Sequence, residues 1–173
     1  MRIQKVGILG SGLMGSGIAQ VAAFSGCEVT LVDIDQQRVD AGIAGIKKRL
    51  DREAERGRIP VAAAEDAVAR LSGVSDWDSL ASLSNVDAVI EAVIEDFDVK
   101  TSLFKRLGAA CRPDALLASN TSSLPLSDLA AASGRPERVI GLHFFHPPWA
   151  LKLVEIVSTA STSEATLADA LQL

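Results

Sequence analysis

The sequence predicts an α/β fold in which helices cover both faces of a doubly wound, mainly parallel sheet. Three observations support this class. Apolar runs of strand length alternate with helical patterns, a glycine-rich turn joins the first run to the first helix, and polar residues gather directly after several strand candidates. The chain contains no internal repeat or low-complexity segment that would indicate another architecture.

The first strand and its turn carry the clearest pattern. An apolar run, Ile3 to Leu9, meets the pattern Gly10-x-Gly12-x-x-Gly15, and a helix is expected from about Leu13 to Ser25. Gly10 permits a tight turn, Gly12 removes a Cβ that would block a diphosphate, and Gly15 lets the helix lie close to the strand. The free amides and the positive dipole end of this helix would then face the diphosphate.

The second strand, Glu28 to Val32, follows a helix stop at Gly26 and ends in Asp33. A carboxylate at this position can accept hydrogen bonds from both adenosine ribose hydroxyls but repels a 2′-phosphate, so the sequence favours NAD over NADP. Strand, glycine turn, helix and acid together are typical of a Rossmann-type unit that binds NAD. An alternative stays open, in which Asp33 or Asp35 only caps the helix that begins near Gln36.

A pair of helices interrupts the alternation after the second strand. The first is charged and is expected from Gln37 to Arg56, with a stop at Gly57, and the second from Pro60 to Leu71. This excursion is longer than a minimal crossover requires. Basic side chains of this region could meet ligand phosphates or form only a solvated face; they are Lys47, Lys48, Arg49, Arg52, Arg56 and Arg58.

The second half of the chain continues the alternation. Its strand candidates are Val86 to Val93, Leu116 to Ser119, Val139 to Leu142 and Leu153 to Val157. Helices are expected from about Phe97 to Ala110 and near Ser127 to Ala132, the second after a polar turn at Asn120 to Ser123.

Polar side chains follow three of these strands. Glu91 and Glu95 come with one, the turn from Asn120 to Ser123 follows the next, and His143 follows another. Ligands of a doubly wound sheet collect beyond the carboxyl ends of its strands, so we expect one site there. Glu155 lies twelve residues after His143, which lets the chain bend back and pair the two. A serine-rich turn can also be only a helix cap, and a lone histidine only a packed structural residue.

Composition bounds the class of protein. With 173 residues, 48% of them hydrophobic, the chain can form a sizeable core as one domain. No apolar run reaches the roughly 20 residues that span a bilayer, so no membrane association is expected. A net charge of −5 argues against a nucleic-acid surface, and the absence of an export signal predicts a cytoplasmic location. Cys27 and Cys111 lack metal-ligand spacing and are expected to pack in the interior.

The ordered set of motifs resembles the NAD-binding domain of the 3-hydroxyacyl-CoA dehydrogenase family, which includes the 3-hydroxybutyryl-CoA dehydrogenases. The resemblance extends from Val6 to about Thr166. Its segments are Gly10-Ser-Gly-Leu-Met-Gly15, Val89-Ile-Glu-Ala-Val-Ile-Glu-Asp96, Ser119-Asn-Thr-Ser-Ser123, Gly141-Leu-His-Phe-Phe145 and Lys152-Leu-Val-Glu-Ile156. The resemblance implies an oxidoreductase of fatty-acid metabolism, in β-oxidation, that interconverts (S)-3-hydroxyacyl-CoA and 3-oxoacyl-CoA with NAD.

The resemblance also implies roles for single residues. His143 would be the general base that takes the 3-hydroxyl proton, and Glu155 would orient it and stabilise its charged form. An imidazole suits this task because its unperturbed pKa is about 6.5. Ser122 and Asn120 would touch the reacting end of the acyl-CoA substrate. Arg56 best matches the position that contacts CoA.

The cofactor set follows from the same resemblance. The expected NAD-binding residues are Gly10, Ser11, Gly12, Leu13, Met14, Gly15, Asp33, Glu95, Lys100 and Ser122. Within this set, Glu95 and Lys100 would position the nicotinamide half, although Lys100 could instead be a solvated residue near a helix start.

The sequence departs from the family pattern at two places. His146 stands where the family has asparagine, next to Pro147-Pro148-Trp149. The chain also ends at Leu173, whereas the family continues into a final strand and a helical domain that dimerises. We therefore expect residues 1–173 to be an NAD-binding domain that lacks the helical dimerisation domain and has little turnover alone. Two alternatives are a dehydrogenase of a free 3-hydroxyacid and a non-catalytic NAD-binding module.

Overall fold

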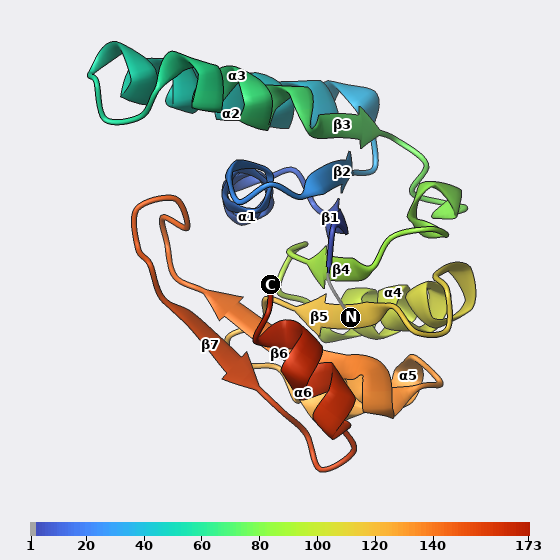
Figure 1. Cartoon of the computed structure of the whole chain (residues 1–173). Helices are drawn as coiled ribbons and strands as arrows, with labels where there is room; N and C mark the ends of the chain where they lie inside the picture. Colours follow the sequence, from blue (N-terminus) through green and yellow to red (C-terminus); the bar gives the residue numbers. More distant parts are fainter. Residues whose placement is uncertain (1–2) are drawn as a thin grey trace.

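The computed structural model describes residues 3–173 and shows one seven-stranded sheet in the order β3-β2-β1-β4-β5-β6-β7 (Figure 1). Its strands are β1 (Lys5–Leu9), β2 (Glu28–Val32), β3 (Leu71–Val74), β4 (Ala88–Glu91), β5 (Leu116–Ser119), β6 (Val139–Phe144) and β7 (Val154–Val157). All neighbouring strands pair in parallel except β6 and β7, which are antiparallel. The predicted doubly wound, mainly parallel sheet is confirmed.

The helices cover both faces of this sheet. They are α1 (Leu13–Phe24), α2 (Gln36–Glu55), α3 (Val61–Ala69), α4 (Phe97–Ala110), α5 (Leu126–Ala132) and α6 (Glu164–Ala170), with short 3₁₀ turns η1 (Ala81–Leu83) and η2 (Pro136–Arg138). Side chains from α1, α2, α3 and α6 share one apolar core, in which Ile8 of β1 is fully buried. Those of α4 and α5 share the other, with the neighbouring Leu9. Successive strand residues thus feed opposite cores, as a sheet buried on both faces requires.

The paired helices after β2 end differently from the sequence expectation. The helix expected from Pro60 to Leu71 ends at Ala69, and Leu71 begins a strand, β3, which pairs in parallel with β2 at the sheet edge. Because β3 contains a serine and a glycine, its sequence does not show the pattern that predicts a strand. The glycine serves packing, because a Cβ on Gly73 would lie 2.3 Å from Val39 Cγ1 of α2. The secondary structure of this segment is therefore determined by its packing against α2 rather than by its own sequence pattern.

Other departures are small. The strand expected from Val86 to Val93 is shortened to β4, and α6 was not expected; its N-cap, Ser163, accepts a hydrogen bond from the Thr166 amide. Cys27 and Cys111 are buried as predicted, and burial raises the pKa of the Cys111 thiol to about 11. Within residues 3–173, no helix combines the length and apolar character needed to cross a bilayer.

Candidate active site

The glycine turn after β1 leaves open space at the start of α1. Gly10 has a φ of +94°, a conformation that favours glycine, and a Cβ there would lie 2.6 Å from the Ala92 carbonyl oxygen. A Cβ on Gly15 would lie 1.8 Å from the Gly10 carbonyl oxygen, so only glycine lets α1 approach the turn this closely. Gly12 is different, because nothing lies within 4 Å of its Cβ position. It also caps α1 without a side-chain hydrogen bond, which leaves helix amides for an anionic group.

Asp33 ties the end of β2 to this turn. Its Oδ2 accepts hydrogen bonds from the Ser11 amide at 2.6 Å and the Ser11 hydroxyl at 2.7 Å, and its Oδ1 accepts one from the Ile34 amide at 2.7 Å. The helix cap is a different residue, since Asp35 accepts the hydrogen bond from the Arg38 amide at 2.8 Å. Of the two acids considered from sequence, only Asp35 caps α2, and Asp33 faces the turn.

A hollow of about 350 Å³ lies between the turn and α2. It is lined by Ser11, Gly12, Leu13, Ser16, Asp33, Arg38, Ala41, Gly42, Gly45 and Arg49. Apolar side chains also stand exposed after two strands, because Ile34 is 54% and Ile94 is 68% exposed. Neither isoleucine, nor Arg38, was predicted from sequence as a site residue. For the isoleucines, an apolar residue shortly after a strand end was the available signal.

A histidine and a carboxylate face each other across the antiparallel pair. His143 of β6 lies directly opposite Glu155 of β7, and His143 Nδ1 is 2.8 Å from Glu155 Oε2. The pairing that the twelve-residue spacing permitted is therefore made. The imidazole also packs against the Phe145 ring, with centroids 4.7 Å apart. Because Glu155 holds Nδ1, the other ring nitrogen is left for a ligand proton.

The turn after β5 lies beside this pair. Asn120 Oδ1 accepts a hydrogen bond from the Phe144 amide at 2.8 Å, which fixes the turn to β6 next to His143. The exposed Ser122 lies further along the turn, where its amide donates to Glu95 at 3.3 Å. The amide oxygen of Asn120 is thus used within the protein, and its NH₂ group remains for other contacts.

Lys100 is buried beneath Glu95 rather than solvated. Its side chain is 1% exposed, and its Nζ lies 2.6 Å from Glu91 Oε1 and 3.1 Å from Glu95 Oε2. The alternative of a solvated Lys100 is therefore wrong. Burial raises the pKa of the Glu95 carboxyl, but hydrogen bonds from Thr121 and Lys100 outweigh it, so the pKa lies below its usual value. The sequence predicts Glu91 only as a polar residue at a strand end, although a glutamate in an apolar strand is a signal for a buried charge pair.

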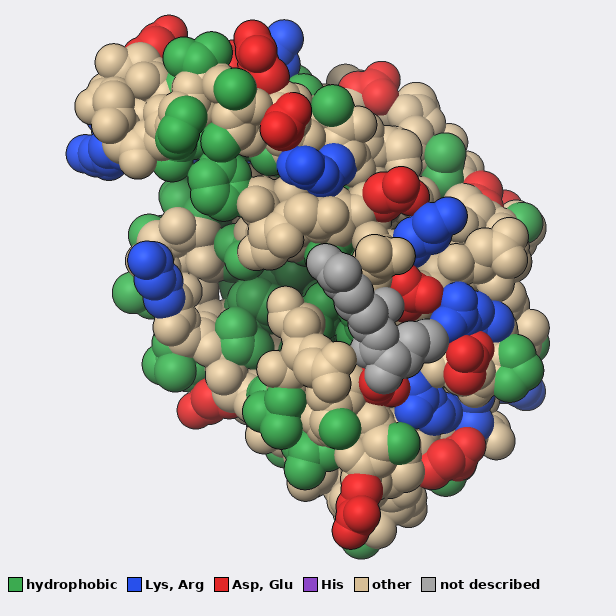
Figure 2. All heavy atoms as spheres, in the orientation of Figure 1, with side chains coloured by type: hydrophobic (Ala, Val, Ile, Leu, Met, Phe, Trp, Pro, Cys, Tyr) green, Lys and Arg blue, Asp and Glu red, His purple; other side chains and the backbone are tan. Residues whose placement is uncertain are grey.

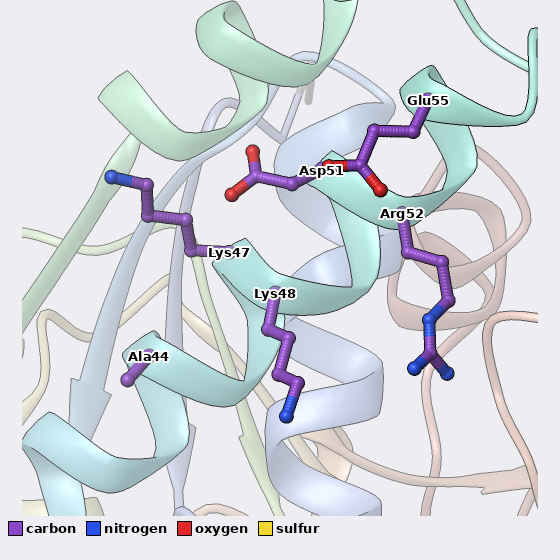
Figure 3. A pocket seen from close by; sticks show the side chains of 6 residues that line it. All are labelled: Ala44, Lys47, Lys48, Asp51, Arg52 and Glu55. Atoms are coloured by element: carbon purple, nitrogen blue, oxygen red, sulfur yellow. The ribbon is translucent and has the colours of Figure 1, made fainter.

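The six basic residues considered for CoA do not form one cluster. Lys48 and Arg52 extend from α2 in the same direction and Lys47 extends away from them, while Asp51 and Glu55 line the same hollow (Figure 3). Arg56 and Arg58 both pair with Glu53, at 3.8 Å and 3.1 Å.

Arg49 belongs to a separate contact. Its guanidinium lies 4.3 Å from the Trp149 ring centroid and donates to Gln20 Oε1 at 2.7 Å, and burial lowers its pKa. The segment from His146 to Trp149 packs on α1 here, since a Cβ on Gly17 would lie 2.9 Å from Pro148. His146 is exposed and meets Trp149 edge-on, with ring centroids 6.2 Å apart.

An apolar groove runs between α1, the end of α2 and the segment before β7. It measures about 650 Å³, and its lining includes Phe24, Leu50, Phe144, Trp149 and Leu153, with Arg58 and Lys152 among its charged residues. Figure 2 shows hydrophobic side chains in a hollow below α1 and beside the C-terminus, where a neighbouring pocket is lined by Ile18, Leu142 and Leu173. Among the described residues, no three His, Cys, Asp or Glu side chains are grouped to hold a metal ion.

Comparison with known proteins identifies the family to which the sequence is similar. A family model described as "3-hydroxyacyl-CoA dehydrogenase, NAD binding domain" matches residues 5–173. The chain is 42% identical over 173 residues to a probable 3-hydroxybutyryl-CoA dehydrogenase of Bacillus subtilis, covering 100% of this chain and 59% of the relative. It is 45% identical over 167 residues to the 3-hydroxybutyryl-CoA dehydrogenase of Mycobacterium tuberculosis, covering 96% of this chain and 57% of that protein. The chain thus spans about three fifths of the length of these relatives.

Solved structures show the same likeness in three dimensions. The crystal structure of (S)-3-hydroxybutyryl-CoA dehydrogenase from Ralstonia eutropha has a TM-score of 0.92 and 38% identity, covering 98% of this chain and 60% of that one. That of 3-hydroxybutyryl-CoA dehydrogenase from Escherichia coli has a TM-score of 0.93 and 41% identity, covering 97% and 35%.

Proposed function

Because the chain belongs to the 3-hydroxyacyl-CoA dehydrogenase family, as its NAD-binding domain, we propose that it supplies the cofactor site and the acid–base pair for interconverting (S)-3-hydroxyacyl-CoA and 3-oxoacyl-CoA. The observation that carries this proposal is the 2.8 Å contact of His143 Nδ1 with Glu155. It lies at the carboxyl edge of the sheet, where the glycine turn also opens.

The residues of the glycine turn fit NAD. The open position above Gly12 and the uncapped amides of α1 suit a diphosphate, and Asp33 suits the adenosine ribose. Leu13 and Met14 belong to the first turn of that helix, and exposed Ile34 offers an apolar surface beside Asp33. NAD, when bound, serves as the two-electron acceptor or donor of the reaction.

The side chains of the protein handle the proton. In the oxidation direction, the free nitrogen of His143 accepts the proton of the substrate 3-hydroxyl as the C3–O bond becomes a carbonyl. Glu155 keeps the other nitrogen protonated, which fixes the tautomer, and it stabilises the imidazolium that forms. In the reduction direction the same imidazolium returns the proton. Asn120 fixes the strand end beside His143 through the Phe144 amide.

The groove beside this pair suits an acyl-CoA. Its apolar lining reaches from Phe144, next to His143, to Leu50 and Ile59 at the far end of the helix pair. Arg58 lies in this lining and Arg56 shares its partner Glu53, so both basic side chains stand where CoA phosphates could bind.

We further propose, from the resemblance of the motifs to the family, that the protein acts in the cytoplasm and in fatty-acid β-oxidation, as a homodimer joined through a helical domain of the kind that the family has.

The deciding experiment combines binding and turnover. NADH titrated onto the purified protein should bind, and a protein extended to the length of its relatives should reduce acetoacetyl-CoA much faster than free acetoacetate. Equal or faster reduction of the free acid would instead indicate a free-acid dehydrogenase. NADH binding with no turnover of either substrate would indicate a non-catalytic module.

A further inference from the structure

Glu91 is a fully buried carboxylate at the end of β4. Its side chain is 0% exposed. Oε1 accepts hydrogen bonds from Lys100 Nζ at 2.6 Å and the Val93 amide at 2.8 Å, and Oε2 accepts one from the Ser119 hydroxyl at 2.6 Å. These donors come from α4, from the loop after β4 and from β5. One carboxylate therefore joins three segments that meet at the carboxyl edge of the sheet.

Lys100 carries this connection to the surface. Its ammonium lies between Glu91 and Glu95, and the Glu95 side chain is 41% exposed. Glu95 in turn accepts hydrogen bonds from the Thr121 hydroxyl and the Ser122 amide of the turn after β5. The exposed carboxylate is thus the outer end of a chain of charged groups whose inner end is Glu91.

The charges explain why the inner residue matters. A buried ammonium needs an anionic partner, because an unpaired charge in the interior is strongly unfavourable. With Glu91 present, Lys100 is neutralised from within and Glu95 can remain at the surface. Without it, Lys100 would depend on Glu95 alone, and that carboxylate would be drawn inward from its contacts with the turn.

We propose that Glu91 is a positioning residue, which holds Lys100 and Ser119 so that Glu95 and the turn from Asn120 to Ser123 present a fixed set of acceptors to a ribose diol. This inference rests on the proposed function, because the diol is that of the nicotinamide half of NAD. Glu91 and Ser119 do not touch the ligand themselves, and they act through Glu95 and the turn.

A double-mutant cycle on NADH affinity tests the connection. Glu95→Gln should weaken NADH binding about tenfold, because it removes a charged acceptor. Glu91→Gln should weaken it by roughly three- to tenfold alone but by less than about twofold in the Glu95→Gln background, since coupled residues are not additive. ADP, which has no nicotinamide ribose, should bind all of these variants as tightly as the native protein.

The matched control is Asp87→Asn, directly before the first residue of the same strand. Asp87 is also a buried carboxylate that holds an arginine, Arg112, at 3.0 Å and accepts two backbone amides. Its loss should leave the ratio of NADH to ADP affinity unchanged. Equal weakening of NADH and ADP by Glu91→Gln, or full additivity with Glu95→Gln, would overturn the proposal and leave Glu91 a structural residue.

A milder variant covers the case in which Glu91→Gln does not fold. Ser119→Ala removes the donor to Glu91 Oε2 and the acceptor of the Thr121 amide at 3.2 Å, while it leaves the Glu91–Lys100 pair in place. It should weaken NADH binding about threefold, with a smaller effect in the Glu95→Gln background. Unchanged NADH affinity in Ser119→Ala, together with an unfolded Glu91→Gln, would also contradict the proposal. Failure of the native protein to bind NADH at all, with ADP binding retained, would refute the proposed function as well.

Discussion

At the scale of single residues, side chains of the same type have different structural roles because their hydrogen-bond partners differ. Asp33 and Asp35 are two residues apart, yet Asp33 organises the glycine turn and Asp35 caps a helix. It could be predicted from sequence that Asp33 and His143 lie at strand ends and that Glu155 can pair with His143, because the strand candidates and the spacing locate them. The bonds of Ser11 to Asp33, and of Ser119 to Glu91, could not. These hydrogen bonds depend on which strands are neighbours in the sheet, which is a property of the tertiary structure.

The preference for NADH over NADPH should depend on Asp33. We expect NADH to bind at least about tenfold tighter than NADPH, because a carboxylate that faces a 2′-phosphate costs more than about 1.4 kcal/mol. Arg38 also lines the hollow but is held by Asp35, with Nε 3.1 Å from Oδ2. Asp33→Asn should reduce the preference for NADH over NADPH, whereas Asp40→Asn on the exposed face of α2 should leave this preference unchanged. Fluorescence titration with both nucleotides decides it, and equal affinities for native protein would show that Asp33 does not read the ribose.

Under the proposed function, proton transfer should depend on His143. In a protein extended to the length of its relatives, His143→Gln should lower turnover by about 10² to 10⁴ with little change in NADH affinity. Glu155→Gln should cause a smaller loss, because the base remains but is poorly oriented. His146→Gln is the control, since His146 contacts Trp149 instead of a carboxylate. A larger loss in the His146 variant than in the His143 variant would reverse the assignment of the base.

At the scale of elements, most helices and strands could be predicted and their close contacts could not. The strands β1, β2 and β5 could be predicted from their apolar runs, because strands buried on both faces of a sheet are apolar along most of their length. The strand β3 escapes prediction because its serine and glycine suit packing against α2 rather than strand propensity. The role of a glycine inside a helix is equally hard to predict, because it depends on how closely a neighbouring element packs against that glycine.

Two such glycines should respond in opposite directions to the same substitution. Glycine to alanine in a helix normally stabilises by roughly 0.5–1 kcal/mol. Gly45→Ala should do so, because its Cβ would meet only Arg49 Nη1 at 3.5 Å. Gly108→Ala should destabilise by about 1–3 kcal/mol, because its Cβ would lie 1.8 Å from the Ser133 carbonyl oxygen at the end of α5. Chemical denaturation of the two variants measures this, and stabilisation by Gly108→Ala would mean that α4 and α5 are not in this close contact.

At the scale of the whole molecule, the sheet brings together groups that are far apart in sequence. The glycine turn, the Glu95 cluster and the His143–Glu155 pair all lie at the carboxyl edge of one sheet. The parallel order made this edge predictable as the site. The separation of Arg49 from the other basic residues, by its contact with Trp149, was not predictable, because it depends on where the segment before β7 packs.

Turnover should depend on chain length more than NADH binding does. We expect residues 1–173 joined to the remaining part of the Bacillus subtilis relative to reduce acetoacetyl-CoA at least about a hundredfold faster than residues 1–173 alone. An open site leaves water in and C3 loosely held, and misplacement by about 1 Å can cost on the order of 10²-fold. NADH affinity should agree within about threefold between the two proteins, because the glycine turn and Asp33 are common to both. Comparable rates at equal NADH would show that residues 1–173 complete the site alone.

Under the proposed function, the placement of His143 and Glu155 on paired strands separates the proton-transfer residues from the segment that lines the groove. Backbone hydrogen bonds between β6 and β7 set the two side chains opposite each other, and a one-residue slip would turn them to different faces. The connecting segment carries His146 and Trp149, and Trp149 lines the apolar groove. Under the proposed function, substitutions in this segment should change which acyl groups are accepted while His143 and Glu155 stay opposite each other. For protein engineering, this segment is the first place to alter substrate range.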